Sequence, residues 1–469
     1  MNSKLVSLFC CLIMLVSFSG CTKVTQLVKD NQPTKAELLA EINEEHQRWE
    51  AAPAADPTPY LRHYDDPADA QKYFDYITDT YSEYDAEKEL TVEEAEEDVN
   101  YLFDAFYYDF AFYDYFGGHT VFDQAKTEIL QELQAKDSLT CKDLQEILVK
   151  HLTFIKDGHF NINHNFPAEK EISFFFRQVM FVKTDSGYQN SKGKTVVSVD
   201  GHPDLDTLFK RSISQEGYLV YYPVLLKEAK FDGTEWDKHV CDEQLTVHYA
   251  DGSTDVLTAD TWSQYYKDLP KGQNTDLRQT DGIPVFQFNS FDGSFLQEVN
   301  AAAAQMSDAA ISMLDLRSNI GGYEEVAHQW INRYSHQRVF STGVRYSVLS
   351  ASLVASPSTS KTPRASNDNI LILLSGKCSA SSAEITLDLS YNLDNSLIIG
   401  ENTNGSMIGN AGHIELPNSK CSVTMTSYSV YLTPDGSDYF EELRGFFPDI
   451  WVPAKEAETL AAKLMENLK

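Results

Sequence analysis

The chain has 469 residues, a formal net charge of −32, and 42% hydrophobic and 12% aromatic residues. This length suffices for about two to four domains with substantial cores, and so acidic a surface disfavours nucleic acid and anionic membrane surfaces as partners. The sequence contains no P-loop, no HExxH motif and no cysteine or histidine spacing typical of zinc. It therefore indicates neither a metal nor another cofactor.

The first 20 residues are typical of a signal peptide. Lys4 precedes the apolar run Leu5–Phe18, which is too short to span a bilayer comfortably but has the length of a signal h-region. Small residues stand directly before Cys21, as at a bacterial lipoprotein cleavage site. We therefore expect lipidation of Cys21, a membrane anchor, and a location on the extracytoplasmic side of the bacterial cell envelope. Ordinary secretion with cleavage nearby is the alternative.

Residues 21–60 indicate a polar tether with one helix, Thr34–Glu50, and residues 61–160 indicate a helical cap domain. Thr91-Val92-Glu93-Glu94 has the form of a capping box, and the apolar residues that follow recur at helical spacing. Two or three helices are expected to pack together here. The aromatic cluster Phe106–Phe116 fits the same spacing and is expected in the core.

Residues 165–275 change to a pattern of short strands. Thr195–Val199 alternates, an Asp-Gly turn follows, and Leu205–Ile213 has a helical pattern. This order resembles part of a PDZ module, although no carboxylate-binding glycine loop is recognisable. A small β-rich spacer is the alternative interpretation.

Residues 280–469 alternate strands with helices, which favours an α/β core with parallel pairing. The expected strands are Pro284–Phe288, Ile311–Leu316, Ile370–Leu374 and Leu397–Gly400, and the expected helices are Phe291–Asp308, Tyr323–Tyr334, Ile385–Leu393 and Lys455–Leu468. Thr424–Leu432 alternates and is expected to close the sheet. The serine-rich stretch Val344–Asn369 is expected to be a mobile rim or lid. Four cysteines beyond residue 21, Cys141, Cys241, Cys378 and Cys421, are scattered singly and are expected as free thiols.

Ser381 stands where an apolar strand turns into a helix. A hydroxyl at the N-terminus of a helix meets free backbone N–H groups and a dipole that favour developing negative charge. Gly321 and Gly322 follow another apolar strand and precede another helix. The two turns are expected to line one cleft, with Ser381 as the nucleophile.

Four motifs in these segments resemble the S41 serine peptidases, which include the C-terminal processing proteases and the tricorn core protease. The motifs are Leu314–Gly322, Ser379–Glu384, Gly400–Gly405 and Gly445–Val452. Their order and number make the resemblance specific over about a third of the chain. It implies a crotonase-like (ClpP-like) ββα spiral core and hydrolysis of peptide bonds in peptide or protein substrates through an acyl-enzyme.

The resemblance also implies which residue is the base. Processing proteases use a lysine twenty-five residues after the nucleophile, and that position is Ser406 here. Lys377 does not match that position. The chain is therefore similar to the histidine-using, tricorn-like branch, which implies His159 as general base. Its competitors are His151, His164 and His413.

In that branch a glutamate supports the histidine through a serine. The resemblance assigns the glutamate to Glu442, with Glu441 as the adjacent alternative. The bridging serine is replaced by Gly158, so Glu442 would act directly or through water, or Asp157 would replace it.

The oxyanion hole is expected to combine the N–H of Ser382 with that of Gly321 or Gly322. Asp315 and Arg317 are expected to brace the glycine turn, and Glu384 is expected to be structural. A rival interpretation is a non-catalytic S41-like lipoprotein that binds peptides or another ligand. A hydrolase of small esters would use the same serine.

Overall fold

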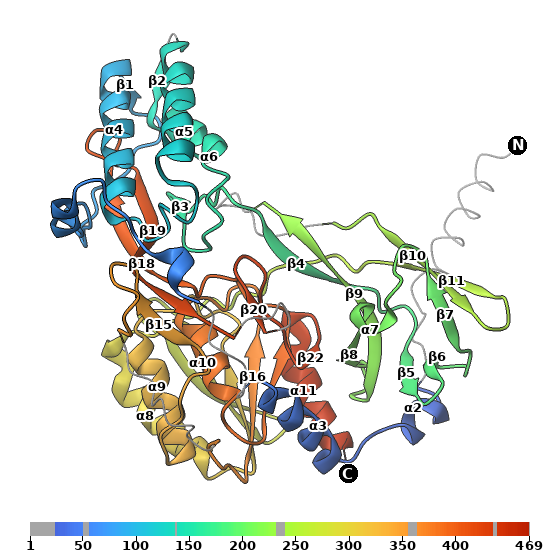
Figure 1. Ribbon diagram of the computed structural model, residues 1–469. Helices are drawn as coiled ribbons and strands as arrows, with labels where there is room; N and C mark the ends of the chain where they lie inside the picture. Colours follow the sequence, from blue (N-terminus) through green and yellow to red (C-terminus); the bar gives the residue numbers. More distant parts are fainter. Residues whose placement is uncertain are drawn as a thin grey trace, which may run out of the picture.

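The computed structural model describes residues 24–49, 56–136, 138–230, 240–354, 364–434 and 439–468. The expected signal peptide and Cys21 lie outside these residues. Within them, no helix combines the length and hydropathy needed to cross a bilayer. Figure 1 shows three parts: a helical cap, a core built on a parallel sheet, and a β-rich lobe beside the core.

The central sheet has six strands in the order β12-β13-β14-β16-β17-β22. Their bounds are Thr275–Thr280, Ile283–Phe288, Ile311–Asp315, Ile370–Ser375, Ser396–Gly400 and Ile450–Trp451. β12 and β13 are antiparallel, and every other neighbouring pair is parallel. The α/β core with parallel pairing is confirmed. The parallel strands matter for function because their carboxyl ends meet at one edge, where both glycine-rich turns begin.

Helices pack on both faces of this sheet. One face holds α8 (Leu296–Ser307), α9 (Glu324–Ser335) and α10 (Ser382–Ser390), in one apolar cluster with Leu314 and Leu373. The other face holds α3 (Lys35–Gln47) and the terminal helix α11 (Ala457–Asn467). The helices expected from sequence are therefore present. α3 begins with the capping box of Thr34 and Glu37, and it packs on the core rather than on the cap.

A second sheet carries the cap. Its strands are β15 (Val344–Ser347), β18 (Gly409–Glu415) and β19 (Ser422–Leu432), with the short β3 (Asn161–Ile162) paired to β19. The expectation that Thr424–Leu432 closes the central sheet is wrong, because alternation identifies a strand but not its partner. The expectation that Val344–Asn369 is irregular is also wrong at the start of that stretch, because Val344–Ser347 pairs with β19. The middle of that stretch, residues 355–363, lies outside the described residues.

The cap consists of three helices, α4 (Val92–Asp109), α5 (Gly118–Gln134) and α6 (Cys141–His151). Capping boxes at Thr91 and Thr140 begin α4 and α6. The apolar faces of the helices share one core with β18 and β19. Buried Asp98 on α4 accepts the backbone N–H groups of Asn418 and Ser419, at 2.7 and 2.8 Å, from the β18–β19 turn. The cap is thereby fixed to the core.

The β-rich lobe contains two sheets, with strand orders β4-β9-β5-β6 and β11-β10-β7, and β8 pairs with β9. The bounds are β4 Lys170–Phe175, β5 Phe181–Thr184, β6 Gly187–Asn190, β7 Val196–Val199, β8 Phe209–Ile213, β9 Leu219–Ala229, β10 Gln244–Tyr249 and β11 Thr254–Thr258. The expected helix Leu205–Ile213 is half wrong: only α7, Leu205–Leu208, is helical, because the next five residues pair with β9.

Short elements complete the fold. They are α2 (Gln26–Asp30), the paired strands β1 (Glu89–Leu90) and β2 (Leu139–Thr140), the paired strands β20 (Phe440–Glu441) and β21 (Gly445–Phe446), and the 3-10 turns Thr58–Tyr60, Pro67–Lys72, Gly293–Phe295 and Ala454–Glu456. The four cysteines are free thiols, as expected, and all except Cys241 are buried.

Candidate active site

Ser381 caps helix α10 in a backbone conformation that L-residues rarely adopt. Strand β16 ends at Ser375, five residues of turn follow, and Ser381 has φ 53° and ψ −117°. Its backbone N–H donates to the Glu384 carboxylate at 2.9 Å. A strained residue held by its surroundings is a frequent feature of active sites. The side chain of Ser381 is half-buried at the start of the helix, as the sequence predicts.

The two glycine-containing turns lie against each other. The hydroxyl of Ser379 donates to the Leu316 carbonyl at 2.9 Å, and the hydroxyl of Ser382 donates to the Gly322 carbonyl at 2.6 Å. A Cβ on Gly321 would lie 2.8 Å from the Cβ of Ser381, so only glycine permits this approach. The expectation that both turns line one cleft is consistent with these contacts.

The backbone N–H groups differ in their availability as oxyanion donors. The N–H of Gly321 donates to the Asn319 side chain at 2.8 Å. No hydrogen bond within the described part of the chain engages the N–H of Gly322 or of Ser382. Of the two glycine donors that the sequence left open, the geometry favours Gly322. Asp315 and Arg317 form the expected ion pair, at 2.7 Å, and so brace this turn.

Glu384 joins the serine turn to the loop that follows β17. Besides the N–H of Ser381, its buried carboxylate accepts the N–H of Gly405 at 2.7 Å, the N–H of Ser406 at 3.0 Å and the hydroxyl of Thr403 at 2.6 Å. The expected structural role of Glu384 is confirmed. Its carboxylate fixes residues 403–406 against the N-terminus of α10.

The histidine turn packs on this same loop. A Cβ on Gly158 would lie 2.0 Å from the Gly405 carbonyl oxygen and 2.7 Å from the Ser406 Cβ. Gly158 lies beyond the end of α6 at His151, and a glycine is required there because the backbone packs so closely. His159 is buried, and both of its ring nitrogens lack a hydrogen-bond partner among the described residues. The histidine turn therefore packs on the same loop that Glu384 bonds to the Ser381 turn.

Glu442 and Asp157 face His159. One ring nitrogen and one oxygen from each carboxylate lie within 4.8 Å of one another. Glu442 accepts the N–H of Gly158 at 2.8 Å, and Asp157 accepts the N–H of His159 at 2.9 Å, with its Oδ1 3.8 Å from the ring Nδ1. Such a trio could ligate a cation, but backbone N–H groups already engage both carboxylates. This arrangement fits an acid-base cluster.

Burial dominates the electrostatics of this cluster. Burial, reinforced by the Lys170 ammonium, lowers the pKa of His159 to about 3, so the imidazole is neutral at pH 7. Burial, together with the charges of Asp157 and Glu384, raises the pKa of Glu442 well above its usual range. A neutral imidazole can accept a proton, and the positive charge of the imidazolium that forms would favour the ionised form of Glu442 beside it.

The competing histidines have other surroundings. His151 bonds Glu132 on α5 at 2.7 Å, His413 bonds the Thr424 hydroxyl at 2.9 Å, and His164 is exposed. Only His159 among them belongs to the carboxylate cluster. Glu441 is exposed and pairs with Arg444 at 2.7 Å, so the geometry favours Glu442 over its neighbour. Lys377 donates to the Thr403 carbonyl at 2.7 Å, which fits a structural role.

Lys170 is a site residue that no sequence motif identifies. It begins β4 in the lobe, and its buried ammonium donates to the Gly158 carbonyl at 3.0 Å and to the Asn404 side chain. The hydroxyl of Ser406 donates to the same Asn404 oxygen at 2.8 Å. A cation from β4 thus lies beside the position where processing proteases carry their lysine. No spacing rule connects residues so distant in sequence.

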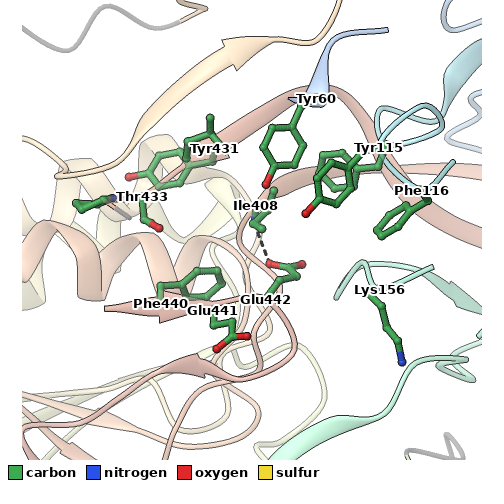
Figure 2. Close-up of a pocket in the computed structure, with 13 residues that line it drawn as sticks. Tyr60, Tyr115, Phe116, Lys156, Ile408, Tyr431, Thr433, Phe440, Glu441 and Glu442 are labelled. Atoms are coloured by element: carbon green, nitrogen blue, oxygen red, sulfur yellow. Dashed lines mark hydrogen bonds between the residues drawn. The ribbon is translucent and has the colours of Figure 1, made fainter. Parts of the chain in front are cut away.

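A cavity of 560 Å³ opens between the cap and the core beside Glu442 (Figure 2). Its cap side comprises Tyr60, Phe112, Tyr115, Phe116 and Lys156, and its core side comprises Ile408, Tyr431, Leu432, Thr433, Pro434, Phe440, Glu441 and Glu442. The expectation that Phe106–Phe116 is core holds for Phe106, Phe110 and Phe112, which are buried. It is wrong for Tyr115, which is 48% exposed at the cavity.

Residues 282–452 match the model of peptidase family S41. The part of the chain that carries Ser381 and both glycine-containing turns therefore belongs to this family. It is accordingly a serine-type peptidase, which acts on peptide or protein substrates. No curated protein matches the chain.

Several solved structures resemble this peptidase at low identity. Mature CPAF complexed with lactacystin is 13% identical with a TM-score of 0.43, and the match covers 80% of this chain and 97% of that one. The photosystem II D1 C-terminal processing protease is 14% identical with a TM-score of 0.37, covering 80% and 97%. The tricorn protease is 12% identical with a TM-score of 0.34, covering 80% and 37%.

Proposed function

We propose that this S41 peptidase cleaves peptide bonds through an acyl-enzyme on Ser381, with His159 as general base and Glu442 as its supporting carboxylate. One observation carries the proposal: the 403–406 loop is bonded to the Ser381 turn through Glu384 and is packed against the histidine turn at Gly158. Proton transfer requires that the nucleophile and the base be held in a fixed relative position. We infer that this loop holds the two turns in that way.

In the proposed reaction, His159 accepts the hydroxyl proton of Ser381 as the serine oxygen attacks the peptide carbonyl carbon. The negative charge that develops on the carbonyl oxygen meets the N–H groups of Ser382 and Gly322, and losing one such donor typically costs about 3 kcal/mol in the barrier. His159 then donates the proton to the leaving amine. In deacylation, His159 accepts a proton from the water that attacks the acyl carbon, and it returns a proton to the Ser381 oxygen as the ester bond breaks.

The proposal includes the surroundings of the active site. The repeated strand and helix units of the core are those of a crotonase-like (ClpP-like) spiral, and residues 165–275 are a PDZ-like or spacer domain next to the cap (61–160) and the catalytic domain (280–469). A lipid on Cys21 would hold the enzyme on the extracytoplasmic side of a bacterial membrane, because two or three acyl chains anchor stably.

The test is hydrolysis of a peptide mixture, followed by mass spectrometry, and then kinetics on one cleaved peptide. Ser381→Ala and His159→Gln should each lower kcat/KM by about 1,000-fold or more. His164→Gln is the matched control, because this histidine is nearby and exposed, and its kcat/KM should stay within about two-fold. Unchanged kcat/KM in either active-site variant would refute the assignment.

A further inference from the structure

We propose that the cavity beside Glu442 is a specificity pocket that binds a large, uncharged apolar or aromatic side chain of the peptide substrate. This inference rests on the proposed function, because the occupant of the pocket is taken to be a side chain of the peptide that the enzyme cleaves. The volume of 560 Å³ lies within the range of about 300–1,000 Å³ that is usual for ligand sites.

Aromatic rings form the pocket from both sides. From the cap, Tyr60 stacks on Tyr115 with ring centroids 4.6 Å apart, and it contacts Phe112 at 5.6 Å. From the core, Phe440 and Tyr431 face them across the cavity (Figure 2). Rings that can offer faces and edges to another ring favour an aromatic or large aliphatic guest over a small one.

The pocket adjoins the catalytic cluster through one side chain. Glu442 lines the cavity, and its carboxylate accepts N–H groups from Gly158 in the histidine turn and from Ile408, which also lines the cavity, at 2.8 and 3.2 Å. Figure 2 shows the Tyr60 hydroxyl pointing toward this carboxylate. A side chain in the pocket therefore lies beside the histidine turn, which is where a residue near the scissile bond belongs.

The charges at the pocket oppose an acidic guest. Glu441 and Glu442 are two of the lining residues, and Arg444 pairs with Glu441. Lys156 is the one basic residue among the described residues that line the cavity; it is exposed, and its ammonium points away from the rings in Figure 2. Burying a guest carboxylate in this partly desolvated site, beside Glu441 and Glu442 and with the Lys156 ammonium turned away, would cost desolvation and Coulomb energy. We therefore expect Phe, Tyr, Leu or Met to be accepted and Asp or Glu to be rejected.

The test uses the full chain and a cleaved peptide in which each position near the scissile bond is in turn Phe, Leu, Ala or Asp. At one position, kcat/KM should favour Phe over Ala by about 10- to 100-fold, with Asp below Ala. Thr433→Trp, which fills the cavity, should bring the Phe-to-Ala ratio close to one. Tyr115→Ala, a change at an exposed ring, should reduce it several-fold.

Tyr266→Ala is the matched control, because Tyr266 is 67% exposed and does not line the cavity. It should leave the Phe-to-Ala ratio unchanged. Thermal unfolding identifies any variant that fails to fold. If Thr433→Trp fails to fold, the Phe-to-Ala ratio of Tyr115→Ala alone tests the pocket. An unchanged ratio in folded Tyr115→Ala and Thr433→Trp would overturn the pocket.

A binding measurement separates this inference from the proposed function. In Ser381→Ala, saturation-transfer NMR should show that N-acetyl-phenylalaninamide binds and that N-acetyl-alaninamide does not. The double variant that also carries Thr433→Trp should no longer bind N-acetyl-phenylalaninamide. This result would support the pocket even if the native chain hydrolysed no peptide, which would refute only the proposed reaction. Equal signals from both amides would overturn the pocket while leaving the reaction untouched.

Discussion

Glu442 accepts a hydrogen bond from the backbone N–H of Gly158, 284 residues earlier in the chain, at 2.8 Å. The bond joins the turn after β20 to the turn that carries His159. It shows how this peptidase holds its glutamate beside the histidine although no serine stands between them.

Replacing Glu442 by Gln removes the charge and keeps the size of the side chain. We expect kcat/KM to fall by about 100- to 10,000-fold, because the imidazolium of His159 then lacks its counter-charge. Glu441→Gln is the control, since Glu441 is exposed and pairs only with Arg444 among the described residues. If Glu441→Gln had the larger effect, the assignment of the supporting carboxylate would be reversed.

Replacing Gly158 by Ser would restore the residue that the histidine-using branch carries there. We nevertheless expect loss of activity, because the new Cβ would lie 2.0 Å from the Gly405 carbonyl oxygen and 2.8 Å from Glu442 Oε1. The forced shift should lower the free energy of unfolding by about 1–3 kcal/mol. Urea unfolding and kcat/KM measure both effects, with Gly293→Ser, an open position whose φ is not left-handed, as a control for glycine replacement alone. A Gly158→Ser enzyme as active as the native one would contradict this packing.

Replacing Ser406 by Lys would recreate the lysine position of the processing proteases. No dyad should result, because Asn404 bonds Ser406 and also holds the buried ammonium of Lys170. A second buried cation beside the first should lower the free energy of unfolding by about 3 kcal/mol or more. Ser406→Ala, which loses one hydrogen bond, should cost about 1 kcal/mol. A stable Ser406→Lys enzyme that stays active without His159 would sink this prediction.

We expect the activity to depend on pH through Lys170. Burial lowers its pKa to about 8, so the ammonium is present below pH 8 and is lost as the pH rises through that value. The Gly158 carbonyl then loses its charged donor, and kcat/KM should fall above about pH 8. Lys170→Met should be about 10- to 100-fold less active at pH 7 and should lack this alkaline decline.

Lys192→Met is the control for Lys170, because Lys192 is exposed in the lobe. It should keep the native profile. A decline of the same size and midpoint in Lys170→Met would show that another group titrates.

Local patterns predict much of this fold. Apolar periodicity identifies the strands and helices around Ser381, and a capping box identifies the start of α4, because these signals depend on near neighbours. The partner of a strand does not depend on near neighbours alone. β19 alternates like a strand that would close the central sheet, yet it pairs with β15 and β18. Leu205–Ile213 has a helical pattern, but pairing with β9 overrides it in the second half.

The site residues likewise fall into those that a local pattern predicts and those that it does not. The position of Ser381 follows from its strand-to-helix turn, and that of His159 follows only from family resemblance. Lys170 and Asn404 are 234 residues apart and meet through the packing of the lobe on the core. Periodicity also fails at Tyr115: its spacing predicts a buried ring, but the ring faces a cavity.

The most direct test of the central claim is the rate at which a fluorophosphonate labels the enzyme. Peptide mapping should place the label on Ser381, and none should appear in Ser381→Ala. His159→Gln should label at least about 1,000-fold more slowly, while His164→Gln should label at the native rate. Labelling of Ser381 at an undiminished rate in folded His159→Gln would contradict the claim that this histidine activates the serine.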